Sequence, residues 1–215
     1  MIKRAFDILV ASVGLVVLAL PFALVAAIIR LTSPGPVFFR QERIGRGFQP
    51  FDILKFRTMV PDAARLGGPL TAGDDPRITR IGKLLRMTKI DELPQLVNVF
   101  LGDMSFVGPR PEVRRYVELY RSDYERLLQV RPGITDLASL KYRHESELLG
   151  RYADPDAAYV NVLLPDKIAL GHEYLRRSSF WFDLGLILKT AFRMAESPGR
   201  NDQATALQTA PQKET

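Results

Sequence analysis

The sequence predicts an α/β protein that is predominantly helical and contains one small β-hairpin. Three observations support this fold class: an uncharged apolar run from Ile8 to Ile29, two short strand-like segments separated by a glycine-containing turn, and helical spacing of apolar residues over most of the remaining chain. A length of 215 residues fits one domain with an appended segment. The chain has no Cys, which excludes disulfides, thiolate metal sites and cysteine nucleophiles.

The apolar run Ile8–Ile29 is long enough to cross a bilayer, since a helix of this length extends for roughly 33 Å. A secretory signal peptide, a straight transmembrane helix and a re-entrant helix that enters and leaves by one face all compete to explain it. Asp7 at its start and the lack of a clear cleavage site disfavour the signal peptide. Pro21 kinks a helix near the middle of the run, and basic residues flank both ends. These features favour the re-entrant form but leave the straight span open.

The body of the chain divides at its turn signals. Val37–Glu42 and Phe51–Met59 have strand character and are joined by a turn with two glycines, while residues 65–78 are rich in Gly, Pro and Asp and predict a loop. Residues 102–111 predict a structured loop, and residues 131–140 a loop with a short strand. Helices are expected at four further ranges: Thr79–Thr88, Asp91–Leu101, Glu112–Val130 and Ala157–Tyr174.

The segment His172–Ala195 predicts an amphipathic helix near the end of the chain. Its aromatic cluster Phe180–Phe182 and its basic residues suit a helix lying in the headgroup region of a membrane, although an ordinary helix packed on the core has the same pattern. The residues from Glu196 onward carry no aromatic side chain, which predicts disorder. We therefore expect a membrane segment at 1–31, a folded body at 32–195 and a disordered tail at 196–215.

Adjacent carboxylates at Asp91 and Glu92 stand three and two residues before Pro94 in the stretch RMTKIDELPQL. An N-terminal cap explains this pattern without any chemistry, because Asp and Pro are both favoured at the start of a helix. A carboxylate at a helix N-terminus could also bind Mg²⁺ or attack phosphorus as a nucleophile, in a place that stabilises phosphate. Both interpretations remain open from the local sequence.

Four basic residues are candidates for binding phosphate. Arg110 is bracketed by two prolines that restrict its backbone, and a guanidinium held in this way can grip phosphate oxygens. Lys55 and Arg57 lie on one face of a predicted strand, and Arg86 adds positive charge near the two acids. A solvated surface is the alternative for each of them. The two histidines lack metal-ligand spacing, no P-loop is present, and nucleic-acid binding is not expected.

Taken together, these motifs resemble the bacterial sugar transferase family, whose members are monotopic polyprenyl-phosphate phosphoglycosyl transferases. The resemblance runs from about Lys3 to Arg193 and rests on KRAFDI, FDILKFRTM, DPRITRIGKLLRMTKIDELPQLVNVFLGDMSFVGPRPE, RPGIT and SFWFDLGLILKTA. It implies transfer of a sugar-1-phosphate from a UDP-sugar to polyprenyl (undecaprenyl) phosphate, which yields polyprenyl-diphosphate-sugar and UMP in the first membrane step of surface glycan assembly. It also implies Mg²⁺ as cofactor, a re-entrant helix broken at Pro21, and a catalytic body with interfacial helices on the cytoplasmic face of the bacterial inner membrane.

The resemblance also implies roles for individual residues. Asp91 matches the nucleophile that forms an aspartyl-phosphosugar and contacts Mg²⁺, Glu92 completes the catalytic dyad, and Arg86 and Arg110 match arginines near the phosphates. Leu20 departs from the family, which often has Ser before the helix-breaking proline. The expected partners are the donor, the acceptor and the lipid bilayer, with a homo-oligomer left open. A membrane-associated aspartyl-phosphate phosphatase and a non-catalytic membrane scaffold are the alternative functions.

Overall fold

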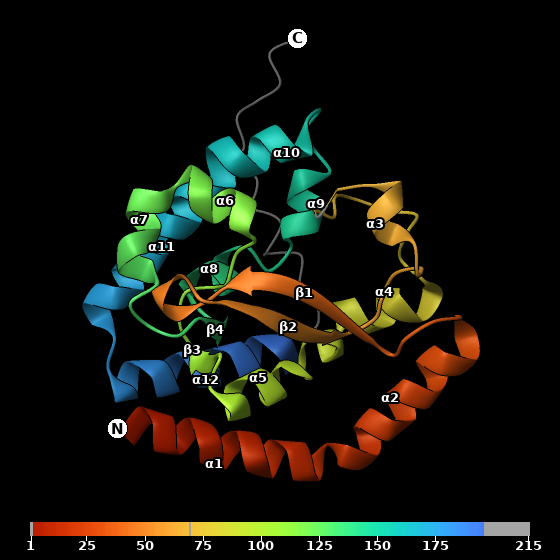
Figure 1. Ribbon diagram of the computed structural model, residues 1–215, viewed down its shortest axis with the longest axis horizontal. Coiled ribbons are helices and arrows are strands. Elements are labelled where there is room, and N and C mark those ends of the chain that lie inside the picture. The colour runs from red at the N-terminus through yellow and green to blue at the C-terminus, as the bar shows by residue number, and fades with distance from the viewer. Residues whose placement is uncertain (1, 69, 196–215) are drawn as a thin grey trace.

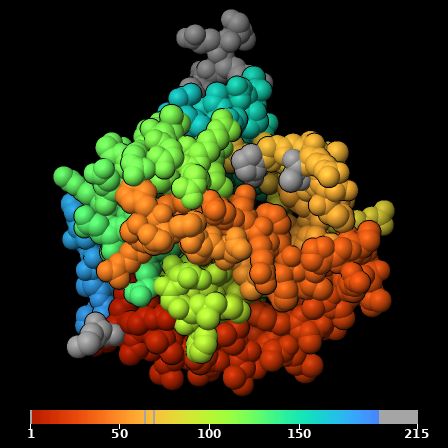
Figure 2. Space-filling view, viewed as in Figure 1, coloured from red at the N-terminus to blue at the C-terminus, as the bar shows by residue number. Residues whose placement is uncertain are grey.

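The computed structural model describes residues 2–68 and 70–195, in which helices predominate over strands. The predicted helical class with a small hairpin is confirmed. Two N-terminal helices lie along one edge of the molecule, a two-stranded hairpin crosses its middle, and most of the remaining helices lie on the other side of the hairpin (Figure 1). The space-filling view shows the hairpin spread across this face, with the N-terminal helices beneath it (Figure 2). The predicted tail at 196–215 lies outside the described residues.

The apolar N-terminal run forms two helices, α1 (Ile2–Val17) and α2 (Ala19–Thr32), which meet at a bend of 59°. Pro21 lies in the first turn of α2 and cannot donate to the Val17 carbonyl, so the predicted kink is confirmed and falls just ahead of the proline. No single helix in the described ranges is long and apolar enough to cross a membrane. The bent pair, taken together, meets both criteria.

The hairpin consists of β1 (Phe38–Ile44) and β2 (Pro50–Phe56), which pair antiparallel with Phe38 opposite Phe56. A short 3₁₀ turn, η1 (Arg46–Phe48), connects the strands, so the predicted hairpin is confirmed although β2 ends before Met59. The Phe22 ring of α2 meets the Phe56 ring edge-on, with 5.3 Å between the ring centroids. This contact joins the N-terminal helix α2 to the strand that carries Lys55.

The segment that carries the two acids departs from the predicted helix at Asp91–Leu101. After α4 (Arg80–Met87), Lys89 adopts a left-handed backbone with φ of 58°. A 3₁₀ turn, η2 (Ile90–Glu92), therefore precedes α5 (Gln95–Leu101), whose N-cap is Pro94. Asp91 lies before α5 rather than within it, because the left-handed residue directs the chain into a tighter turn.

A second, parallel sheet pairs β3 (Ser105–Val107) with β4 (Gly133–Thr135). The short strand expected within 131–140 is confirmed as β4, whereas β3 was not predicted because three residues are too few to show alternation. In the predicted loop at 65–78, Arg77 donates to the carbonyls of Gly68 and Leu70. A short helix, α3 (Ala63–Leu66), overlaps the first two residues of that predicted loop.

The second half of the body is built from short helices. The long helix predicted at Glu112–Val130 is wrong, since the chain breaks at Tyr120 and Glu112 precedes the first helical residue. The helix expected at Ala157–Tyr174 is present as three consecutive helical segments. The elements are α6 (Arg114–Leu119), α7 (Arg121–Leu127), α8 (Leu137–Lys141), α9 (Glu145–Leu149), α10 (Pro155–Ala158), the π-helix η3 (Tyr159–Leu163) and α11 (Leu164–Arg177).

The amphipathic helix predicted at His172–Ala195 is present only in part, as α12 (Phe180–Ala195). Residues 172–177 instead end α11, and the chain breaks at Ser178. It buries Leu186 in a cluster with Val107 of β3, while Trp181, Leu188 and Phe192 stay exposed. One face therefore packs on the core, as the ordinary interpretation requires, and the opposite face presents large apolar side chains to the surroundings.

Candidate functional site

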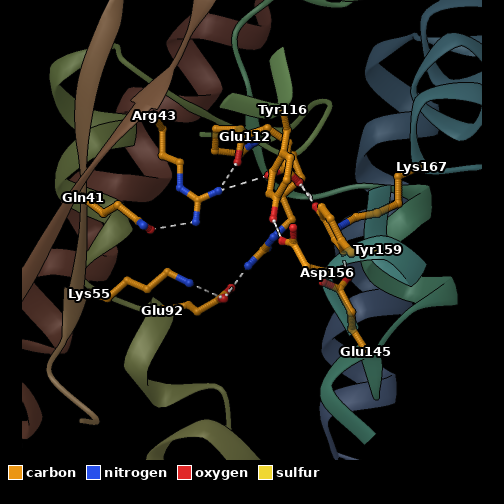
Figure 3. Close-up of polar contacts among 12 residues, drawn as sticks. Gln41, Arg43, Lys55, Glu92, Glu112, Tyr116, Glu145, Asp156, Tyr159 and Lys167 are labelled. Atoms are coloured by element: carbon orange, nitrogen blue, oxygen red, sulfur yellow. Dashed lines mark hydrogen bonds and ion pairs between the residues drawn. The ribbon is translucent and has the colours of Figure 1, made fainter. Parts of the chain in front are cut away.

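Glu92 lies at the centre of an ionic network formed by three distant segments. Its Oε1 atom accepts hydrogen bonds from the Lys55 Nζ atom of β2 at 2.8 Å and from an Arg110 Nη atom at 2.6 Å. Figure 3 shows the Lys55 side chain directed at Glu92 from the hairpin. The predicted grouping of Lys55, Glu92 and Arg110 at one place is thus present in the structure.

The charges of this network stabilise one another. Burial alone would raise the pKa of Glu92, but Arg110 and Lys55 hold that pKa well below its ordinary value, so the carboxylate stays ionised. The Glu92 carboxylate in turn raises the pKa of Arg110, whereas burial lowers the pKa of Lys55. Two cations around one anion leave a net positive charge, which favours an anionic ligand such as phosphate.

Asp91 is buried beside this network and has a different environment. Its Oδ1 atom has no hydrogen-bond partner among the described residues, and the N-terminus of α5 has no side-chain cap. Of the two interpretations of Asp91, the helix cap is therefore not what the structure shows. Burial raises the pKa of the Asp91 carboxyl, with the Lys55 ammonium opposing that shift. An acid that forms no internal hydrogen bond retains free lone pairs for a metal ion or for phosphorus.

Arg86 lies near Asp91, as predicted, whereas Arg57 does not join the site. The Arg86 Nε atom donates to Thr58 Oγ1 at 2.8 Å, and the positive charge of Arg86 acts on Asp91. The Arg57 guanidinium instead donates to the carbonyls of Pro34 at 2.7 Å and Ser33 at 2.8 Å. Because these bonds tie the end of β2 to the turn after α2, we leave Arg57 out of the proposed phosphate site.

The acidic groups of the site suit one kind of metal ion. The described residues contain no group of three or more His, Asp or Glu side chains arranged to hold a metal. Glu92 is already engaged by two cations, which leaves Asp91 as the acid with free lone pairs. Mg²⁺ commonly keeps several waters and binds one or two carboxylates together with substrate phosphates. The residues present fit an ion of that kind, held jointly with a diphosphate.

A second buried ionic cluster was missed by sequence reasoning. Glu112 contacts Arg43 at 3.3 Å and Lys167 at 3.5 Å, and accepts a hydrogen bond from Tyr159. Lys167 also contacts Glu145 at 2.9 Å (Figure 3). The four partners come from β1, η3, α11 and α9, so no local motif signals the cluster. The PRPE run around Arg110 was the one available hint, because it places Glu112 two residues after a predicted phosphate ligand.

The two clusters lie on either side of the Arg110 loop. The backbone N–H of Arg110 donates to Asp136 Oδ2 at 3.1 Å, and the Pro111 carbonyl accepts from an Arg43 Nη atom at 3.1 Å. A cavity of about 20 Å³ is lined by side chains that include Arg110, Glu112 and Lys167. The Glu112 cluster thus holds the loop from which the Arg110 side chain reaches Glu92.

Comparison with known proteins places this site in a family. The family model described as bacterial sugar transferase matches residues 1–197. A UDP-glucose:undecaprenyl-phosphate glucose-1-phosphate transferase of Caulobacter vibrioides is 42% identical over 197 residues, which cover 87% of this chain and 67% of the relative. The exopolysaccharide production protein ExoY of Sinorhizobium fredii is 35% identical over 203 residues, covering 87% of this chain and 83% of that protein.

Another relative is considerably longer than this chain. The UDP-N-acetylgalactosamine-undecaprenyl-phosphate N-acetylgalactosaminephosphotransferase of Aeromonas hydrophila is 37% identical over 192 residues, which cover 88% of this chain and 42% of the relative. The chain therefore spans about two fifths of the length of that relative. The match of the family model over nearly all of the described residues shows that the chain belongs to the bacterial sugar transferase family.

Proposed function

We propose that this protein transfers a sugar-1-phosphate from a UDP-sugar to polyprenyl phosphate and releases UMP. One observation carries the proposal: two adjacent acids lie in opposite environments. Glu92 is held by two cations, whereas the buried Oδ1 atom of Asp91 has no hydrogen-bond partner among the described residues. This is the division of roles that a nucleophile and a neighbouring charge-organising residue require. The printed names of the relatives support the same donor and acceptor classes.

The proposed reaction has two steps at one phosphorus atom. An Asp91 oxygen attacks the donor phosphorus that bears the sugar, the bond from that phosphorus to the bridging oxygen breaks, and UMP leaves with the electron pair. A phosphate oxygen of the lipid then attacks the same phosphorus, and the bond to Asp91 breaks to restore the carboxylate. Lys55, Arg110 and Arg86 supply positive charge around the group that becomes more negative in each step.

Mg²⁺ is the cofactor that we propose for this reaction. Its chemistry when bound is to neutralise the charge of the donor diphosphate, and Asp91 is the protein ligand that we assign to it. Glu92 supports the site by holding both neighbouring cations through its Oε1 atom.

We also propose that α1 and α2 form a re-entrant segment that holds the body at the cytoplasmic face of the inner membrane. Both ends of the bent pair contact the body: Arg4 donates to the Val99 carbonyl at 2.6 Å, and Ile29 is buried against Phe56. A straight span would separate these ends by the thickness of the hydrocarbon layer. The apolar side chains of the pair that stay exposed include Leu9, Val13, Val16, Leu20 and Leu24.

The chemical proposal is tested by replacing Asp91 with Asn in the full-length protein. Wild-type protein, Mg²⁺ and polyprenyl phosphate should release UMP from at least one member of a UDP-sugar panel. We expect Asp91→Asn to lower that rate by about 10⁴-fold or more and to abolish covalent labelling by the donor, because the amide is a poor nucleophile. UMP release from this variant at the wild-type rate would refute the nucleophile assignment.

The topology proposal has its own test. Tags placed at residue 2 and at the C-terminus should both report the cytoplasm when probed in whole cells and in inverted vesicles. An external N-terminal tag would establish a straight span.

The alternative function as a phosphatase is tested separately. Release of inorganic phosphate from simple phosphomonoesters without UMP would favour that alternative.

A further inference from the structure

Gln95, in the first turn of α5, is buried without the contacts that a buried amide normally makes. Its side chain is 1% exposed, and neither its Nε2 nor its Oε1 atom has a hydrogen-bond partner among the described residues. Burying an amide without hydrogen bonds costs stability, whereas an apolar side chain of the same size would carry no such cost. The amide is therefore retained at the expense of stability.

A second amide on the same helix shows that this is not a general property of α5. Asn98 is 4% exposed, and its Oδ1 atom accepts from the Leu54 N–H at 3.0 Å. Its Nδ2 atom donates to the Asp52 carbonyl at 2.8 Å. Asn98 therefore holds α5 against β2, while Gln95, one turn earlier, contributes no such bond.

The unpartnered atoms concentrate at the turn that carries Asp91. Three of the six buried side-chain atoms without hydrogen bonds in the described residues belong to Asp91 and Gln95. Asp91 lies in the 3₁₀ turn η2 and Gln95 is the first residue of α5, so only three residues separate the two buried side chains along the chain. A donor in Gln95 and an acceptor in Asp91, four positions apart in the chain, are thus both buried, and neither is bonded among the described residues.

We propose that Gln95 is a positioning residue for the Asp91 carboxylate, a role that rests on the function proposed above. When the donor diphosphate binds, Gln95 Nε2 donates to Asp91 Oδ1 and leaves the second carboxylate oxygen facing the phosphorus. Hydrogen bonds of this type are often long in the free enzyme and tighten in the substrate complex. Oδ1 becomes the carbonyl oxygen of the acyl phosphate, so the same N–H donates to it throughout and no proton is transferred.

The proposal makes opposite predictions for stability and for rate in the Gln95→Met variant, which keeps the side-chain length and removes both polar atoms. The thermal midpoint should equal or exceed that of the wild type, because no hydrogen bond is lost. The kcat for UMP release should fall about 10- to 100-fold with KM for the UDP-sugar changed less than about threefold, since orientation of the nucleophile acts on the chemical step.

Two variants provide matched controls in the same full-length protein. Gln129→Met makes the same chemical change at an exposed glutamine near the end of α7 and should leave both the midpoint and kcat unchanged. Asn98→Leu removes an amide that is bonded to β2 and should lower the midpoint clearly. Comparison of the thermal midpoints of the Gln95→Met and Asn98→Leu variants shows whether the Gln95 amide is unbonded in the resting protein.

Each result decides the inference. A lower midpoint for Gln95→Met would show that its amide is bonded in the resting protein and would overturn the proposal, as would an unchanged kcat. A raised KM with unchanged kcat would assign Gln95 to donor binding and would also overturn it. If the wild-type protein releases no UMP from any UDP-sugar, the proposed function itself fails; if the wild type is active and Gln95→Met equals it, the positioning role alone fails.

Discussion

Two glutamates, the partly buried Glu92 and the buried Glu112, lie on either side of the Arg110 loop, and each contacts two basic side chains. The partners of Glu92 are partly open to solvent, since the Lys55 and Arg110 side chains are 20% and 29% exposed. The Arg43 and Lys167 partners of Glu112 are 19% and 8% exposed, and the buried Tyr159 hydroxyl adds a hydrogen bond. The same charge pattern therefore occurs twice, and the Glu92 cluster is the more accessible of the two.

The difference teaches which cluster can exchange partners. An anion that reaches Lys55 and Arg110 can share their positive charge with Glu92, because both side chains have solvent-facing surface. Glu112 instead holds β1 to α11 through Arg43 and Lys167, and the Glu112 and Lys167 side chains are only 7% and 8% exposed. We therefore expect changes at Glu92 to affect the reaction and changes at Glu112 to affect stability.

The largest expected effect is on stability in Glu112→Gln. The neutral amide leaves Lys167 and Arg43 without their central anion, and breaking a buried ion pair in this way costs about 3–5 kcal/mol. Chemical denaturation of the purified protein should show this loss. The rate of UMP release per folded molecule should change much less.

An exposed ion pair next to this cluster serves as the control. Arg114 contacts Glu42 of β1 at 3.2 Å, with both side chains more than half exposed. Arg114→Gln should change the free energy of unfolding by no more than about 0.5 kcal/mol, because exposed pairs are screened by solvent. Equal losses in the Arg114 and Glu112 variants would remove the distinction between buried and exposed pairs.

The next effect is on catalysis in Glu92→Gln. Lys55 and Arg110 then lack the anion that orients them, so kcat for UMP release should fall about 10²-fold, which corresponds to about 2.7 kcal/mol. Stability should fall less than in Glu112→Gln, since water can reach both cations. A large loss of stability with normal kcat would reverse the comparison between the two glutamates.

The smallest expected effect is on how the free energy of unfolding depends on pH, which should differ between the wild type and Glu112→Gln. Burial raises the pKa of Glu112, but Lys167 and Arg43 together hold it below the ordinary value of 4.5. A carboxyl with a lowered folded-state pKa contributes stability above its unfolded value, and the contribution is lost as pH falls through the folded-state pKa. The stability gap between the two proteins should be full at pH 7 and shrink below about pH 4.5; a constant gap would contradict the pKa direction.

The features that could be predicted from the sequence are those whose signals are local. Asp91 and Glu92 adjoin in the chain, and Pro21 marks the helix break, because each of these features depends on a few neighbouring residues. Strand alternation predicted that Arg57 shares a face with Lys55 and binds phosphate. In the structure Arg57 lies just beyond the end of β2 and donates to the turn after α2 instead. Glu112, Tyr159 and Lys167 could not be grouped, because residues far apart in sequence meet through packing that no periodicity records.

The sequence by itself determined the helical class, the hairpin, the bent apolar segment and the identity of the two acids, since these follow from hydrophobic period, turn residues and a proline without an N–H. Only the tertiary structure decided what each acid contacts. The left-handed Lys89 turns Asp91 away from the cap position, and the hairpin and the Arg110 loop converge on Glu92 from opposite sides. Side-chain environment depends on which distant segments pack together. For that reason Glu92 is bound by two cations while the adjacent Asp91 forms no hydrogen bond, and the pKa values of the two acids shift in opposite directions.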